Sequence, residues 1–143
     1  AEKFNNGMEY FNSFGGNPVS CAVGRTVLEI IEKEKLQENA YLIGKYLIKE
    51  LNGLKMRHSL IGDIRGRGLF LGVELIRDHE KLIPASSEAY QIINDMKDQG
   101  VLLSTDGPDH NVIKIKPPML FTKNNADQLL DTLDQLLIGN KYN

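Results

Sequence analysis

Three short stretches of the chain contain the residues that could do chemistry, and the first is SFGGNP. Ser13 supplies a hydroxyl, two glycines follow an aromatic residue, and Asn17 and Pro18 form a good helix start. Helix N-termini with a nearby hydroxyl can bind anions such as phosphate. A turn before a capped helix explains the same residues and is common. On local evidence the stretch therefore predicts a turn, with an anion contact as the alternative.

The second stretch, DIRGRGLFLGVEL, carries two arginines. Arg65 and Arg67 are separated by one glycine. Arginine can bind a carboxylate or a phosphate through two parallel hydrogen bonds. We favour the structural interpretation, in which this is a glycine-rich strand whose arginines are solvated or pair with Asp63 and Glu74.

The third stretch, NVIKIKPP, alternates in character. In a strand, Lys114 and Lys116 point to one side, and Ile113 and Ile115 point to the other. The usual meaning of such alternation is a half-exposed strand with a solvated lysine face. The alternative is that one lysine faces an anionic ligand.

No stretch predicts a metal site or a nucleophile. The three histidines are far apart in sequence, and none has a metal-ligand spacing with Cys21. We predict that the histidines are surface residues. Cys21 has no base near it in sequence and is predicted to be a small buried residue.

Composition narrows the class of protein. The 143 residues include 17 Lys and Arg against 19 Asp and Glu, and hydrophobic residues make up 41%. This is an ordinary globular mixture without a strong electric field, so no nucleic-acid partner is predicted. No apolar run is long enough to span a bilayer, and the first residues have no signal-peptide character. A single cysteine excludes an internal disulfide and fits an intracellular, reducing compartment.

These stretches need elements to position them. Residues 1–16 lack periodicity and predict a connector. Apolar residues at helical spacing predict helices over 17–35, over 36–52 with Gly53 at its end, from Ser86 to Gly100, and after a Thr122 cap. Closely spaced apolar residues and glycines predict a strand with a bulge or turn over 61–76, and further strands over 101–104 and 112–115.

This order of elements predicts an α+β domain. A short antiparallel or mixed sheet should have helices on one face. We predict three segments: a connector at 1–16, a linking helix at 17–35 and a small α/β domain at 36–143. The connector has no obvious partner within the sequence. We therefore expect an exposed apolar patch around Phe11, Phe14 and the first helix.

Taken together and in this order, the three stretches resemble one family. SFGGNPVSCAVG, GDIRGRGLFLGVEL and VIKIKPPMLFT look like the C-terminal third of class III aminotransferases. The resemblance covers essentially the whole chain. MEYFNSFGGNPVSCAVG, GDIRGRGLF and KIKPPM resemble the branch of ethanolamine-phosphate and 5-phosphohydroxylysine phospholyases more than the amino-acid transaminases.

The resemblance implies a fold-type I homodimer that binds pyridoxal 5′-phosphate at the subunit interface. Ser13 stands where the family usually has a threonine that reaches the cofactor phosphate of the neighbouring subunit. Lys114 stands where transaminases commonly have an arginine that binds the substrate carboxylate, which argues against an ordinary α-amino-acid transaminase. The lysine that forms the Schiff base has no match in this chain. We therefore expect this chain alone to be inactive and not to retain the cofactor.

Three functional hypotheses remain open. The first is a phospholyase that releases phosphate and ammonia from a phosphoethanolamine-like amine. The second is a class III transaminase, for example of the alanine–glyoxylate type. The third is a stand-alone α+β binding module, because fold alone does not determine function. The missing large domain, a second subunit and a small amine are the expected partners, and mitochondrial residence is suggested only by the family likeness.

Overall fold

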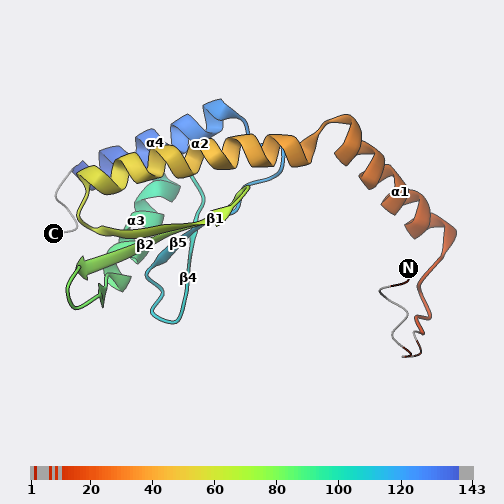
Figure 1. Ribbon diagram of the computed structural model, residues 1–143, viewed down its shortest axis with the longest axis horizontal. Helices are drawn as coiled ribbons and strands as arrows, with labels where there is room; N and C mark the ends of the chain where they lie inside the picture. The colour runs from red at the N-terminus through yellow and green to blue at the C-terminus, as the bar shows by residue number, and fades with distance from the viewer. Residues whose placement is uncertain (1, 3–6, 8, 10, 139–143) are drawn as a thin grey trace. The chain divides into compact units, whose positions relative to one another are not determined.

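The computed structural model describes residues 2, 7, 9 and 11–138 of the chain (Figure 1). It divides into two compact units, Ala1–Lys35 and Leu36–Asn143. Part of the predicted connector at 1–16 lies outside the described residues. The assignment of these segments to the domains of a larger enzyme stays a prediction.

The first unit contains helix α1, Pro18–Lys33, which starts where the sequence predicts. The Asn17 side chain accepts a hydrogen bond from the Ser20 amide at 2.9 Å and so caps the helix. No residue of α1 is buried. The expected apolar patch is confirmed, because Phe11 and Phe14 are 86% and 85% exposed and apolar residues of α1 are exposed with them: Val19, Val23, Val27, Leu28 and Ile30.

The second unit begins with helix α2, Leu36–Arg57, which runs past its predicted end at Gly53. The prediction treated glycine as a helix terminator. However, Leu54 continues the buried stripe one turn after Leu51, and it is only 3% exposed. Burying a leucine gains about 1.5–3 kcal/mol, whereas a glycine inside a helix costs about 0.5–1 kcal/mol. The free energy gained by burying Leu54 therefore outweighs the low helix propensity of Gly53, and the helix continues.

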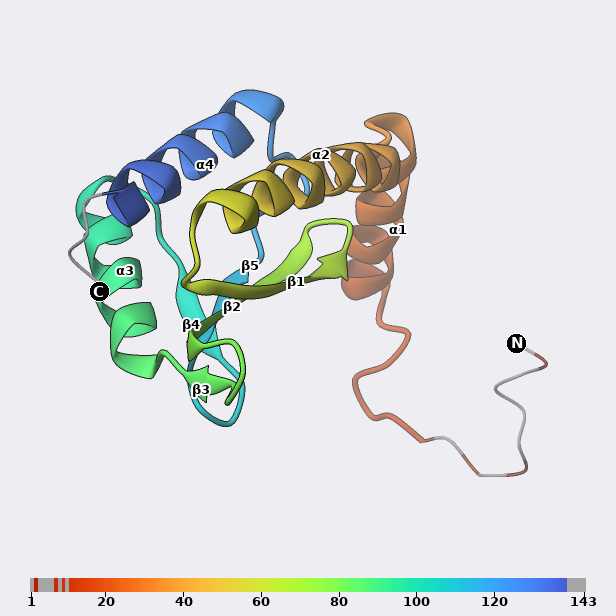
Figure 2. The same cartoon turned by 60° about the vertical axis from the view of Figure 1, so that its left-hand side comes forward.

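A small antiparallel sheet follows, as predicted. The order of its main strands is β1-β2-β5-β4, and β3 pairs with β2 at the side (Figure 2). The strands are β1 Ile61–Arg67, β2 Phe70–Asp78, β3 Ile83–Pro84, β4 Ser104–Asp106 and β5 Val112–Ile115.

The glycine-rich stretch over 61–76 forms both the bulge and the turn that were predicted as alternatives. The pairing of β1 with β2 shifts between Ile61 and Asp63, and the two strands turn through Gly68 and Leu69. Gly68 has a φ of +57°, which suits the first position of a two-residue hairpin loop. The short strand β3 was not predicted, because two residues are too few to show alternation.

The strand predicted over 101–104 is misplaced, because β4 begins at Ser104. The Val101 amide donates to the Met96 carbonyl at 2.9 Å, so Val101 closes the turn that ends the preceding helix. Leu103 packs against the core, whereas Leu102 is 83% exposed. The apolar character of this segment reflects burial of some side chains without strand pairing.

The three helices described in this unit contribute to one core. They are α2, α3 (Ser86–Asp98) and α4 (Lys123–Ile138). Their buried side chains form a single cluster with alternate residues of the strands, such as Val73 and Ile113. The helices therefore cover one face of the sheet, as predicted, and the opposite face of the sheet is open (Figure 1).

Candidate functional site

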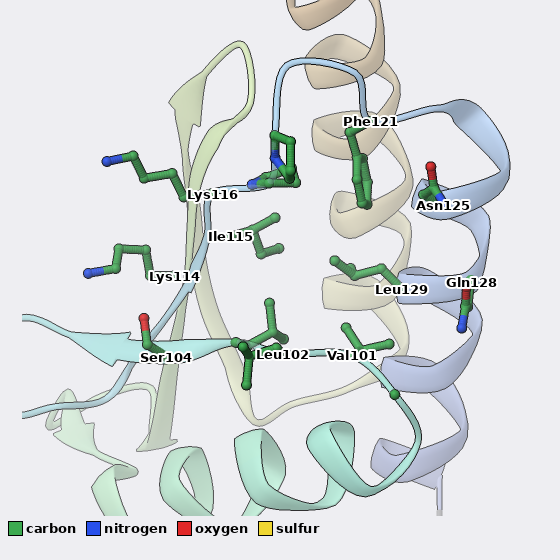
Figure 3. A pocket seen from close by; sticks show the side chains of 14 residues that line it. Val101, Leu102, Ser104, Lys114, Ile115, Lys116, Phe121, Asn125, Gln128 and Leu129 are labelled. Atoms are coloured by element: carbon green, nitrogen blue, oxygen red, sulfur yellow. The ribbon is translucent and has the colours of Figure 1, made fainter.

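Lys114 on β5 lines two hollows of the second unit. The larger has a volume of about 650 Å³ and lies between residues 100–104, residues 114–118 and α4 (Figure 3). The smaller, about 350 Å³, lies on the open face of the sheet. Lys114 and Lys116 point to the same side in Figure 3, and Ile115 points to the other, as the alternation predicts. Lys114 therefore borders both hollows, and its ammonium extends over the open face of the sheet, away from the interior of the larger one (Figure 3).

The register of the sheet explains the smaller hollow. Arg65, Gly72, Lys114 and Ser104 lie opposite one another on four neighbouring strands. Gly72 has no side chain, so a gap lies over it between the side chains of Arg65 and Lys114, and a methyl group of Val112 borders this gap. A gap between two long cationic side chains is suited to a small anionic group.

Asp106 on β4 is the partner of Lys114. The Lys114 ammonium lies 3.0 Å from Asp106 Oδ2, and the Gly107 amide donates to Asp106 Oδ1 at 2.8 Å. The hydrogen bond from Lys114, followed by that from Gly107, holds the pKa of the Asp106 carboxyl below its ordinary value. The carboxylate is therefore charged at neutral pH and is held by the first residue of the turn that follows it.

Buried polar contacts hold this turn in place. Asn111 is only 4% exposed, and its side-chain amide donates to the Leu75 carbonyl at 2.9 Å. The Leu75 amide donates in return to the Asn111 carbonyl at 2.8 Å. The Ser86 hydroxyl donates to the Asp109 carbonyl. Strand β2 and helix α3 thus position the loop between β4 and β5, which directly follows Asp106.

The arginines of β1 have separate environments. Arg65 pairs with Asp63 at 2.9 Å and with Glu74, which are the two partners that the structural interpretation predicted. Both contacts use Nη1, and no described residue accepts a hydrogen bond from Nε or Nη2. Arg67 is exposed and makes no ion pair with any described residue.

Sequence reasoning missed two residues beside Lys114. Asp106 comes to Lys114 only through the register of β4 against β5. Phe70 is 58% exposed, and the Lys116 ammonium lies 5.7 Å from the centre of its ring. The only signal for Asp106 was its place in the turn-rich segment that joins two strands. No pattern in the sequence indicated the contact of Phe70.

Ser13 lies in the first unit, in the turn that precedes α1. The Asn12 side chain accepts hydrogen bonds from the Phe14 and Gly15 amides, each at 3.1 Å. The Asn17 side chain donates to the Phe14 carbonyl at 2.9 Å. The turn is therefore held by its own side chains. The Ser13 hydroxyl is exposed and bonds to no described residue, so it fits a single contact with a phosphate oxygen.

The remaining candidates do not form a site. Cys21 is exposed, so its predicted burial is wrong, because no part of α1 is covered within its unit. His79 and His110 are exposed as predicted. His58 is instead only 10% exposed and pairs with Asp134 on α4. Among the described residues no cluster could hold a metal ion, and no helix has the length and apolar character needed to cross a membrane.

Comparisons with known proteins agree on one family. The model of class III aminotransferases matches residues 2–137. The mitochondrial alanine–glyoxylate aminotransferase 2 homolog 2 of Arabidopsis thaliana is 52% identical over 87% of this chain and 26% of its own length. Ethanolamine-phosphate phospho-lyase homolog 1 of Caenorhabditis elegans is 42% identical over 90% of this chain and 28% of its own.

A solved structure extends the likeness to the whole fold. A phospholyase from Arthrobacter, in complex with phosphoethanolamine, superimposes with a TM-score of 0.87 and 39% identity over 96% of this chain. That match covers 33% of the phospholyase chain. The present chain thus spans between a quarter and a third of the length of these three proteins.

Proposed function

The chain belongs to the class III aminotransferase family, and from this premise we propose that it is part of a pyridoxal-phosphate enzyme that acts as a phospholyase on a small phosphorylated amine. The products would be inorganic phosphate, ammonia and an aldehyde. The resemblance to the phospholyase branch is confirmed by relatives of that kind. The activity of the whole enzyme is our inference.

The position and residue type of Lys114 are the observation that supports this proposal. Its side chain lines the smaller hollow on the open face of the sheet, next to the gap over Gly72, and points away from the interior of the larger hollow (Figure 3). Lysine is a compact point charge, which can attract a phosphate from several directions but cannot form the planar double contact that arginine makes with a carboxylate. The residue type and its place both favour a phosphorylated substrate.

Lys114 has a physical role in the proposed reaction. As the bond between carbon and the phosphate oxygen breaks, negative charge increases on the departing phosphate. A fixed cation beside that group stabilises the charge as it develops. Arg65 borders the same gap, but Asp63 and Glu74 already compensate its charge, so we assign this role to Lys114.

Pyridoxal phosphate, when bound, supplies an electron sink for the carbon next to the substrate nitrogen. We propose that Ser13 donates a hydrogen bond to the phosphate of this cofactor in the neighbouring subunit of a homodimer. The Schiff-base lysine and most of the cofactor pocket are expected in a large domain outside these residues. We therefore propose that this chain alone neither retains the cofactor nor catalyses the reaction.

Ser13 offers a direct test of cofactor binding. We expect Ser13→Ala in the full-length enzyme to weaken binding of pyridoxal phosphate by about tenfold, since a hydrogen bond to a charged group contributes about 1.5–3 kcal/mol. Cofactor absorbance during dialysis measures this loss. Ser20→Ala is a matched control, because among the described residues its hydroxyl bonds to the Asn17 side chain alone. Equal retention by wild type and Ser13→Ala would exclude the role of Ser13.

The proposed activity is tested by two parallel incubations of the full-length, cofactor-loaded enzyme. One contains phosphoethanolamine, with release of phosphate and ammonia as the measurements. The other contains alanine and glyoxylate, with glycine and pyruvate as the measurements. We expect products only in the first. Transfer of the amino group without phosphate release would contradict the proposal.

The second candidate function is transamination of the alanine–glyoxylate type. The name of the Arabidopsis relative favours it. The same incubations decide between the two activities. That relative and others are named mitochondrial, so we also propose a mitochondrial location for the whole protein. Membership of an enzyme family leaves the hypothesis of a stand-alone binding module without a supporting observation.

A further inference from the structure

Charged side chains on the open face of the sheet are sorted into rows. Asp63, Glu74 and Asp106 occupy one row across the strands, together with Val112. The neighbouring row contains Arg65 and Lys114 on either side of Gly72. The next row contains Arg67 opposite Phe70 on β2, and Lys116 lies over the Phe70 ring. An acidic row therefore borders two rows of cations.

Lys114 lies at the boundary between acids and cations. Its carboxylate partner Asp106 is the diagonal neighbour on the acidic side, because Ser104 is directly opposite Lys114. On its other side the chain continues to Lys116, which makes no ion pair with any described residue. An anionic ligand would be attracted to the cationic side, whereas Asp106 draws the ammonium in the opposite direction.

We propose that Asp106 competes with the phosphate group of substrate and product for Lys114, and thereby promotes release of inorganic phosphate. This inference rests on the proposed function, because it concerns the same anion site. When the site contains no phosphate, Lys114 pairs with Asp106. When phosphate binds, the ammonium turns toward it, and Asp106 keeps its hydrogen bond from Gly107.

The strength of the ion pair suits such an exchange. The side chains of Lys114 and Asp106 are 32% and 58% exposed, so solvent screens their attraction. A phosphate monoester carries a charge of about −1.5 to −2 at pH 7, against −1 for the carboxylate. Phosphate can therefore displace Asp106. Because Asp106 is fixed 3.0 Å away, it pairs with the lysine again as soon as the phosphate leaves.

The first test is a titration of the 143-residue chain with inorganic phosphate, followed by NMR. The backbone amide signals of Lys114 and its neighbours report binding. We expect Asp106→Asn to bind phosphate about two- to fivefold more tightly than wild type, the range that corresponds to an exposed ion pair. Asp109→Asn is the matched control, since it removes one charge from the same loop without contact to Lys114.

A double-mutant comparison shows whether Asp106 acts through Lys114. We expect the effect of Asp106→Asn to vanish when Lys114 is already Met. In the full-length enzyme the same Asp106→Asn change should lower the inhibition constant of inorganic phosphate by a similar factor. A purely structural role would change thermal stability but neither of these values.

The outcomes separate this inference from the function on which it rests. If phosphate binds the wild type, fails to bind Lys114→Met, and binds Asp106→Asn no more tightly, competition is excluded and the anion site remains. Equal tightening by Asp106→Asn and Asp109→Asn would also exclude it, because the effect would then be one of net charge. If no variant binds phosphate near Lys114, both the site and the inference fail.

Discussion

Replacing Gly44 by Ala is expected to lower the free energy of unfolding by about 3 kcal/mol, at the upper end of the usual cost of overpacking. Gly44 is buried on α2 and faces the turn between β1 and β2. An added Cβ would lie 2.1 Å from the Gly68 carbonyl oxygen and 2.5 Å from its carbonyl carbon. These atoms are backbone, so they cannot move aside by rotating a side chain. The helix must separate from the hairpin instead.

Gly53→Ala is the matched control in the same helix. Its Cβ would have only the Arg57 guanidinium nearby, at 4.0 Å. Alanine is favoured over glycine inside a helix by about 0.8–1 kcal/mol, so this change should stabilise the chain. Urea unfolding followed by circular dichroism measures both variants. Equal stability of Gly44→Ala and wild type would show that α2 does not approach the hairpin as closely as the structure indicates.

Local patterns were sufficient to predict most elements of the fold. Helical spacing identified the four helices of the described part of the chain, and alternation identified β5 and the side on which Lys114 lies. The two errors have different causes. The end of α2 depends on burial of Leu54 against other elements, which local propensity does not contain. The start of β4 depends on a local hydrogen bond from Val101 to Met96 that closes the end of α3, which a search for alternating apolar residues does not detect.

Sequence reasoning identified only part of the candidate site. Lys114 was identified from alternation and from the family likeness. Its surroundings depend on register: four strands must align before Gly72 separates Arg65 from Lys114, and β4 must begin at Ser104 before Asp106 reaches the lysine. A strand placed over 101–104 does not include Asp106 at all. The acidic row is therefore a tertiary property of the sheet.

Lys114→Met is the substitution with the largest expected effect on activity. In the full-length enzyme we expect kcat/KM for phosphoethanolamine to fall by about 100-fold, equivalent to about 3 kcal/mol, because one member of a charged pair with the substrate is lost. Methionine keeps most of the unbranched stem that packs on the sheet. Thermal stability should change little, since the ion pair with Asp106 is exposed to solvent.

Two other variants test whether the loss of activity depends on the position and the geometry of the charge at residue 114. Lys116→Met removes a cation from the same face but not from the gap over Gly72, so we expect a much smaller loss. Lys114→Arg restores the charge and should recover part of the activity toward phosphoethanolamine. It also introduces the planar fork that grips carboxylates, so activity with carboxylate-bearing amines should rise relative to phosphoethanolamine. If Lys114→Met kept full activity with phosphoethanolamine, the substrate phosphate would have to be bound elsewhere, and the exchange with Asp106 would have no part in turnover.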